Sequence, residues 1–199
     1  RLRDARWLEG YESWLAGGKP VLPMLTLLKV REVELRNRIV VSPMATYSAV
    51  EGVLQDFHLV HLGARALGGA ALVFVEMTSP TPEGRITPGC PGLWNDTQQA
   101  AFERIVRFVH GHSSARIGLQ LGHSGPKGST QLGWEHTDEP LPAPDGRPDA
   151  APNWPLLAAS AVSYGPQNQV PRAMTRADMD TMTAALVAST RRAAAAGLA

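Results

Sequence analysis

Residues that could contact a ligand follow three apolar stretches of the sequence, and each stretch predicts a buried strand. RIVVS (38–42) runs into PMATY (43–47), ALVFVEMT (71–78) ends in an acid, a methionine and a threonine, and ARIGLQLGH (115–123) carries a glutamine and a histidine. A tyrosine hydroxyl and a glutamine amide donate and accept hydrogen bonds, and small residues let a ligand approach the backbone. The sequence contains neither GxGxxG nor GxxxxGK[ST], so a flat heterocycle with a mixed donor and acceptor edge suits these residues better than an isolated phosphate.

The elements that must position these residues alternate between strand and helix. Repeated alternation favours parallel strands joined by right-handed crossovers, and the carboxyl ends of such strands meet at one rim. Between the third strand and the third helix lies a long segment rich in Pro and Gly, 124–173. In an α/β barrel, a connection that follows a strand lies on the face where active sites form. Helical spacing is found over 56–67, 96–111 and 175–197.

Shorter elements are predicted before this repeat. Residues 3–16 have the spacing of an amphipathic helix with its aromatic residues on one side. LTLLKV (25–30) and VELRNRIVV (33–41) predict two strands that pair as a hairpin around Arg31 and Glu32. Helix-capping residues are expected at Asn95 or Asp96 and at Thr175.

Several motifs match one family in order and spacing over about the last five-sixths of the chain. They are NRIVVSPMATY, DFHLVHLGARALGG, VFVEMTSPTPEGRI, GLWNDTQ and IGLQLGHSGPK. With them the sequence resembles the old yellow enzymes, which are FMN-dependent ene-reductases on a (β/α)8 barrel. The variant LGHSGPKGSTQLGW has Pro126 where the commoner family form has Arg. That variant is similar to the reductase half of the two-flavin aminobenzoyl-CoA monooxygenase/reductase and salicylyl-CoA hydroxylase-type proteins.

The resemblance implies cofactor-binding roles at the three strand ends. Gln120 would hydrogen-bond the pyrimidine part of the flavin, and the backbone N–H of Met77 would meet the flavin edge. Ala45 departs from many relatives, in which Thr or Cys contacts the flavin carbonyl, so the resemblance implies a different redox potential here. The residues that would lie against the flavin ring, partly through their backbone, are Ser42, Pro43, Met44 and Ala45.

The resemblance also implies a substrate site and a reaction. Tyr47 would act as the catalytic residue and reach over a pocket for a small-molecule substrate. His123 would contact substrate or flavin, with a purely structural use as an equal alternative. The implied reaction passes hydride from NAD(P)H through FMN to an activated alkene or to an unsaturated or aromatic acyl thioester.

Two other functions stay open from the sequence. The first is a non-catalytic half-barrel, an interaction or assembly module that has kept the flavin-facing sequence. The second is a metal-dependent barrel hydrolase, because six histidines are present. His110 and His112 resemble a ligand pair, but they fall at a predicted helix end, where a histidine favours the helix dipole without any ligand. A metal site is therefore not expected.

The composition is that of an ordinary globular protein. Of 199 residues, 44% are hydrophobic and the net charge is +1, which gives no electrostatic reason to expect nucleic acid or a membrane as a partner. The longest apolar runs, such as AALVFV (70–75), are too short to span a bilayer. The single cysteine, Cys90, cannot form an internal disulfide, which favours a reducing, cytoplasmic setting and a loop role for this residue.

The expected fold class is α/β: an N-terminal portion of a TIM (β/α)8 barrel, about three βα units, preceded by a short helix and a β-hairpin. Residues 1–25 are predicted as a helix and linker, and residues 26–199 as the barrel portion. A full barrel needs about 250 residues, so we expect the 199 residues to be inactive alone. A three-stranded parallel sheet leaves two edges and one face uncovered. We therefore expect a homo-oligomer or pairing with the remainder of a longer polypeptide.

Overall fold

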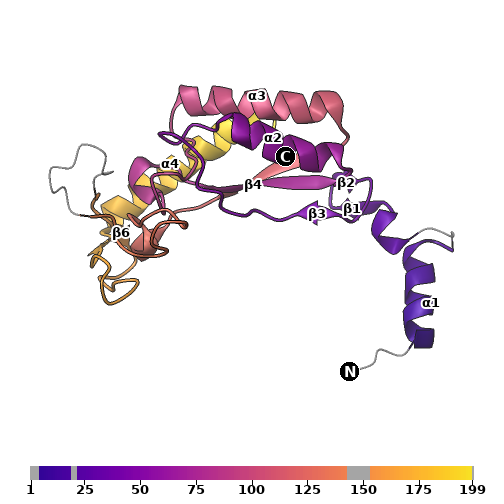
Figure 1. Cartoon of the computed structure of the whole chain (residues 1–199), viewed down its shortest axis with the longest axis horizontal. Helices are drawn as coiled ribbons and strands as arrows, with labels where there is room; N and C mark the ends of the chain where they lie inside the picture. The colour runs from indigo at the N-terminus through magenta and orange to yellow at the C-terminus, as the bar shows by residue number, and fades with distance from the viewer. Residues whose placement is uncertain (1–4, 19–21, 143–152, 199) are drawn as a thin grey trace.

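The computed structural model describes residues 5–18, 22–142 and 153–198. At its centre is a three-stranded sheet whose strands all run parallel (Figure 1). The long strand β4 lies in the middle, so the carboxyl ends of all three strands meet at one edge. The predicted parallel arrangement is confirmed. Its strands are β3 (Val40–Val41), β4 (Leu72–Thr78) and β5 (Arg116–Leu121).

The pairing of β4 with β5 is interrupted near the end of β4. Val75 is the register partner of Leu119, but the next pair along is Met77 with Gln120. Glu76 is thus an extra residue in β4, a β-bulge that changes the direction of the side chains around it. Val75 and Glu76 are consequently both buried, although neighbours in a regular strand point to opposite faces.

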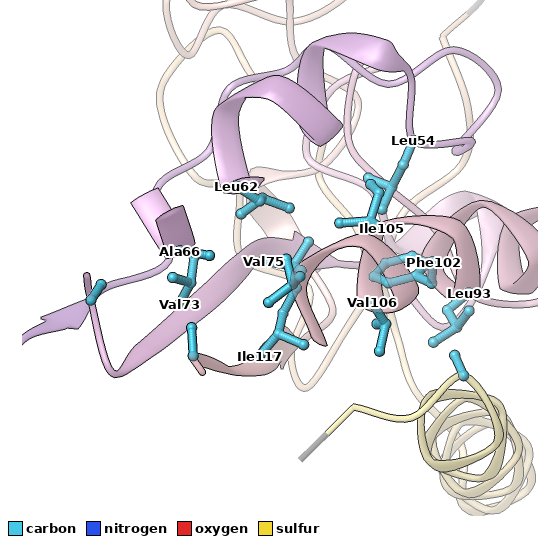
Figure 2. Close-up of a cluster of buried hydrophobic side chains, with 14 residues drawn as sticks. Leu54, Leu62, Ala66, Val73, Val75, Leu93, Phe102, Ile105, Val106 and Ile117 are labelled. Atoms are coloured by element: carbon cyan, nitrogen blue, oxygen red, sulfur yellow. The ribbon is translucent and has the colours of Figure 1, made fainter. Parts of the chain in front are cut away.

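Two helices cover one face of the sheet, and a third packs beside them. α2 (Asp56–Leu67) and α3 (Asp96–His112) lie side by side above β4, and α4 (Arg176–Ala195) contacts α3 and β5 (Figure 1). Their apolar faces bury the core in Figure 2, in which Phe102 is 1% exposed. This core supplies the stability of the unit because apolar surface removed from water is the main favourable term in folding. Its larger members are Leu54, Leu62, Val73, Val75, Leu93, Phe102, Ile105, Val106, Val109 and Ile117.

The three helices begin where the sequence provides capping residues. Asn95 accepts a hydrogen bond from the N–H of Gln98, and Thr175 accepts one from Asp178, each completing a capping box. The predicted starts of α3 and α4 are confirmed. α2 begins with a third capping box in which His58 accepts the N–H of Gln55.

The N-terminal elements also follow the prediction. α1 (Ala5–Leu15) precedes the antiparallel hairpin of β1 (Leu28–Val30) and β2 (Val33–Leu35), which turns through Arg31 at φ 52°. The aromatic residues of α1 do lie on one side, where Tyr11 stacks on Trp7 and Trp14. All three are exposed, and in Figure 1 the helix projects away from the sheet.

One prediction about the strands needs correction. The first strand was predicted over 38–42 with both faces buried, but β3 has two residues and Val40 is exposed. In the described part of the chain β3 pairs only with β4, and Pro43 has no N–H to continue a ladder. The long connection also contains regular structure, the short parallel pair of β6 (Leu157–Ala158) and β7 (Arg172–Ala173). None of the helices described is long and apolar enough to cross a membrane.

Candidate functional site

The structure brings the predicted cofactor-binding residues to one rim of the sheet. Met77 and Gln120 are register partners on adjacent strands, and the segment 42–45 continues directly from β3 on the other side of β4. The sequence that follows this segment returns to β4, because the N–H of Thr46 donates to Glu76 at 2.7 Å. The side chains of the rim are accessible: Ser42, Met44, Ala45 and Gln120 are exposed, and Pro43 and Met77 are half-buried.

Gln120 was predicted to hydrogen-bond the cofactor, and this role stays a prediction. Its side chain is exposed at the end of β5, and within the described residues the amide has no hydrogen-bond partner. An amide offers adjacent donor and acceptor groups, as the edge of a nitrogen heterocycle does. Gly122 follows on the same rim, where an added Cβ would lie 3.3 Å from Cγ of Met77. The absence of a side chain at Gly122 therefore leaves room beside Met77.

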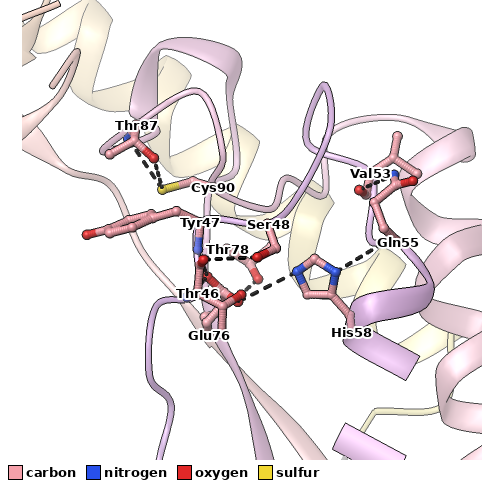
Figure 3. Close-up of polar contacts among 10 residues, drawn as sticks. All are labelled: Thr46, Tyr47, Ser48, Val53, Gln55, His58, Glu76, Thr78, Thr87 and Cys90. Atoms are coloured by element: carbon pink, nitrogen blue, oxygen red, sulfur yellow. Dashed lines mark hydrogen bonds and ion pairs between the residues drawn. The ribbon is translucent and has the colours of Figure 1, made fainter. Parts of the chain in front are cut away.

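The rim is held in place by Glu76, a buried acid that is only 5% exposed (Figure 3). Its carboxylate accepts the N–H of Thr46 at 2.7 Å, the N–H of Tyr47 at 3.3 Å and the hydroxyl of Thr46. Burial raises the pKa of Glu76, while the donors from Thr46 and Tyr47 act in the opposite direction. One side chain of β4 thus fixes the end of the exposed segment 42–45.

His58 faces the same carboxylate from α2. Its Nδ1 accepts the N–H of Gln55 at 3.0 Å, so in the neutral ring the proton is on Nε2. This Nε2 lies 3.7 Å from Oε1 of Glu76 and makes no hydrogen bond in the structure. Burial lowers the pKa of His58 to about 4, with the nearby His61 acting in the same direction. His58 is therefore neutral at physiological pH.

Tyr47 turns the chain away from the sheet. Its φ of 50° lies in the left-handed region, and its ring points away from Glu76 and His58 (Figure 3). An added Cβ at Gly133 would lie 3.4 Å from Cε2 of this ring, so the part of the long segment around Gly133 lies beside Tyr47. Burial raises the pKa of Tyr47, with smaller effects from Cys90, which raises it, and Lys127, which lowers it. The hydroxyl is thus a hydrogen-bond donor at neutral pH.

Two charged side chains hold parts of the long segment near Tyr47. Lys127 Nζ lies 2.7 Å from a carboxylate oxygen of Asp138, and the hydroxyl of Tyr164 donates to Asp138 at 3.2 Å. The hydrogen bond that Lys127 donates to Asp138 raises the pKa of Lys127. Lys127 is thus held in an ion pair.

His123 stands at the same end of the sheet, at the start of the long segment. Its Nδ1 accepts the N–H of Gly125 at 3.0 Å, and burial lowers its pKa. This contact stabilises a turn, and a ligand-binding role for His123 stays a prediction. Further on, Arg85 lies against the rings of Trp94 and Trp154, at 5.7 and 5.2 Å from their centroids. These contacts attach the long segment to the loop after β4.

Sequence reasoning missed the role of one residue, Glu76. It was recognised only as part of a strand end, although an acid inside the apolar run LVFVEMT was the available signal. A buried carboxylate must have hydrogen-bond partners, but the sequence does not say which residues provide them. Cys90 is buried rather than exposed in its loop, and its Sγ accepts the N–H of Thr87 at 3.4 Å. Burial raises the pKa of this thiol.

Comparison with known proteins agrees with this geometry. The family model of the NADH:flavin oxidoreductase / NADH oxidase family matches residues 24–198. An NADH:flavin oxidoreductase of Gibberella zeae is 35% identical over 177 residues, which are 87% of this chain and 41% of that protein. An NADPH dehydrogenase of Geobacillus thermodenitrificans is 33% identical over 169 residues, covering 84% of this chain and 43% of that protein. The chain therefore belongs to the NADH:flavin oxidoreductase / NADH oxidase family.

Solved structures show that old yellow enzymes share its fold. Morphinone reductase superposes with a TM-score of 0.71 over 88% of this chain and 46% of that one, at 24% identity. Old Yellow Enzyme from Pichia sp. AKU4542 gives a TM-score of 0.70 over 88% of this chain and 44% of that one. The fold is thus that of part of a TIM barrel, as predicted, and the chain spans less than half the length of these relatives. The narrower likeness to two-flavin proteins stays a prediction.

Proposed function

We propose that this chain provides the first strand ends of the FMN site in an NAD(P)H-dependent oxidoreductase that reduces an activated alkene or an unsaturated or aromatic acyl thioester. The observation that carries the proposal is the single rim formed by the segment 42–45, Met77 and Gln120. These residues are far apart in sequence and accessible together, as a ligand with one flat face and one polar edge requires. The family to which the chain belongs supports the same cofactor.

The residues of the rim fit a flavin. The exposed amide of Gln120 has no partner among the described residues and matches the donors and acceptors of a pyrimidine edge. Ser42 and Ala45 carry small side chains, so a planar ring can approach their backbone. Bound FMN would supply hydride transfer between a nicotinamide and an electron-poor double bond. The residues that would hold it are Ser42, Pro43, Met44, Ala45, Met77 and Gln120.

The chain's own residues then orient the substrate. The hydroxyl of Tyr47 stays protonated because burial raises its pKa, so it can donate a hydrogen bond to a substrate carbonyl. Such a bond favours the electron-rich form that the carbonyl takes during reduction. The long segment covers one side of Tyr47 and limits the access of water to it. Substrate contact by His123 would use Nε2, since its Nδ1 accepts the N–H of Gly125.

We infer that turnover requires further barrel units. In the described residues the sheet is open, and Leu119, Leu121 and Leu198 line a hollow of about 290 Å³ between β5 and α4. A parallel sheet is normally covered on both faces. Another part of a longer polypeptide, or a second copy of the chain, would complete the cover.

The test uses the natural full-length polypeptide that carries this sequence, purified in a reducing buffer. We expect a flavin absorption spectrum, release of FMN at one per chain on denaturation, and oxidation of NADH or NADPH coupled to reduction of an α,β-unsaturated ketone or thioester. Absence of flavin binding would refute the proposal. Flavin binding without turnover on any such acceptor would favour the non-catalytic half-barrel, and a stoichiometric metal in elemental analysis would favour the hydrolase.

A further inference from the structure

We propose that Glu76 is a positioning residue that sets the place of the flavin-facing segment 42–45 and thereby the environment of the flavin. This inference rests on the proposed function, since it concerns the same site. Glu76 does not itself belong to the exposed rim, because its side chain is buried beneath it. Its effect on the cofactor would pass through the backbone of the residues that it binds.

The first support is the β-bulge in β4. The bulge makes Glu76 an extra residue between the register pairs of Val75 and Met77. Bulges commonly occur next to active sites, where they re-aim a side chain. Here the carboxylate is aimed from the central strand at the chain that follows β3, whose Thr46 is 30 positions away in sequence. β4 is paired with β5 on both sides of the bulge, at Val75 and at Met77, which holds the backbone around Glu76.

The second support is that three donors converge on this carboxylate. Thr46 contributes its N–H and its hydroxyl, and Tyr47 contributes its N–H. The Nε2–H of His58 also faces the carboxylate at 3.7 Å, beyond hydrogen-bond distance. An ionised carboxylate only accepts hydrogen bonds, so it satisfies the three donors, whereas a glutamine would turn an NH2 group towards one of these N–H or O–H groups. The site is therefore built for a carboxylate and for no other side chain of this shape.

The third support is the place of the bonded residues. Thr46 and Tyr47 directly follow the exposed segment 42–45, and β3 directly precedes it. The segment is thus tied at its start by the pairing of β3 with β4 and at its end by Glu76. A side chain that fixes both Thr46 and Tyr47 positions the predicted flavin face and the predicted substrate tyrosine together. Preorganised sites depend on such supporting residues.

The test compares Glu76→Gln with the control Glu34→Gln in the FMN-loaded full-length protein. Glu34 is exposed on β2, so its substitution makes the same chemical change away from the rim. Losing hydrogen bonds to a charged group typically changes an equilibrium by about tenfold or more, so we expect the FMN dissociation constant of Glu76→Gln to rise about tenfold. We also expect a shifted flavin absorption band and midpoint potential, while Glu34→Gln matches the parent protein in all three.

A second variant covers the case in which Glu76→Gln does not fold. Thr46→Val removes only the hydroxyl donor and keeps both N–H groups, so we expect a smaller shift of the same flavin band and potential. When both proteins fold, the double variant should shift the potential by less than the sum of the single changes, since the two side chains share one contact.

Failure of the proposed function and failure of this inference give different results. A parent protein that binds no FMN refutes the proposed function before any variant is compared. A parent protein that binds FMN, with band, potential and dissociation constant unchanged in Glu76→Gln and Thr46→Val, refutes the positioning role of Glu76 alone. Shifts in both variants but not in Glu34→Gln support it.

Discussion

The helix-covered face of the sheet and the rim at its strand ends are built on different principles. Beneath α2 and α3, contacts are apolar and the side chains are almost wholly buried, as Phe102 and Ile117 are. At the rim, the exposed segment 42–45 leads into Thr46 and Tyr47, which donate hydrogen bonds to the buried carboxylate of Glu76 (Figure 3). β4 contributes to both regions: its first four residues are apolar, and Glu76 and Thr78 near its end are polar.

The difference shows that one strand can stabilise the fold with its first half and position a ligand-binding segment with its last residues. Apolar packing is strong but non-directional, so it holds the helices on the sheet without fixing a ligand-binding loop to a fraction of an ångström. Hydrogen bonds to a buried carboxylate are directional, so they fix the position of the backbone groups that donate them. Substitutions in the covered face should therefore change mainly stability, and substitutions at the rim should change mainly the site.

The largest effect is expected from the covered face. Phe102→Ala would remove a fully buried ring from the core and should lower the free energy of unfolding by about 3–5 kcal/mol. Urea unfolding measures this change. Phe57→Ala, on the exposed side of α2 at 50% exposure, is the matched control and should cost less than about 1 kcal/mol. Equal losses in the two variants would mean that the core does not lie where the structure places it.

The next effect concerns pH and the buried His58. Its pKa is about 4 in the folded chain, against 6.5 for an ordinary histidine. The unfolded chain therefore binds a proton here between these values that the folded chain does not, and stability is lost as the pH falls from 6.5 towards 4. A shift of this size corresponds to at most about 3 kcal/mol. Burial lowers the pKa of His61 and His123 in the same direction and raises that of Glu76, which opposes the loss.

The variant His58→Asn isolates this contribution. Asparagine keeps an acceptor for the N–H of Gln55 but does not titrate, so we expect a smaller loss of stability between pH 6.5 and 4 than in the parent protein. His110→Asn, an exposed change on α3, should keep the parent slope. If stability fell equally with pH in the parent protein and in His58→Asn, His58 would have to be protonated alike in the folded and the unfolded parent chain.

A middle-sized effect is expected where the rim touches a neighbouring loop. A Cβ at Gly89 would collide with the backbone carbonyl of Tyr47. Gly89→Ala should therefore move Tyr47 and cost about 1–3 kcal/mol, as overpacking usually does. Gly111→Ala on α3 meets nothing within 4 Å and should instead stabilise the helix by about 0.5–1 kcal/mol. NMR of the Tyr47 amide would report the movement, and an unshifted signal in Gly89→Ala would contradict the contact.

The sequence was sufficient to predict elements that depend on local signals. α3 and α4 begin at Asn95 and Thr175 because each cap and its partner lie three residues apart. The parallel direction of the strands followed from the alternation of strands with helices. The burial of β3 was not predictable in the same way: an apolar run looks alike at the edge and in the middle of a sheet, and only the pairing shows that Val40 is exposed.

The candidate site was predictable in part for the same reason. Its strand-end residues were found because parallel strands bring their carboxyl ends together. The role of Glu76 was not, because it depends on donors from Thr46 and Tyr47 that meet it only in three dimensions. The ion pair of Lys127 with Asp138 depends likewise on the path of a long loop.

A smaller effect is expected at Ala45, on the exposed segment of the rim. If this residue faces the flavin carbonyl, the hydroxyl in Ala45→Thr would favour the reduced flavin and raise the midpoint potential by about 20 mV, the equivalent of one ordinary hydrogen bond. Ala45→Val has the same shape without the hydroxyl and is the control. Redox titration of both proteins gives the answer, and identical potentials would refute the placement of Ala45.

The smallest effect is expected for a charged contact outside both regions. Arg104 Nη1 lies 2.7 Å from Asp56 and links α3 to α2, but the two side chains are 54% and 83% exposed. Exposed ion pairs are screened by water and salt, so Arg104→Ala should change the free energy of unfolding by less than about 0.5 kcal/mol and not at all in high salt. A loss of several kcal/mol in urea unfolding would show that charge, and not only the apolar core around Phe102, holds these helices together.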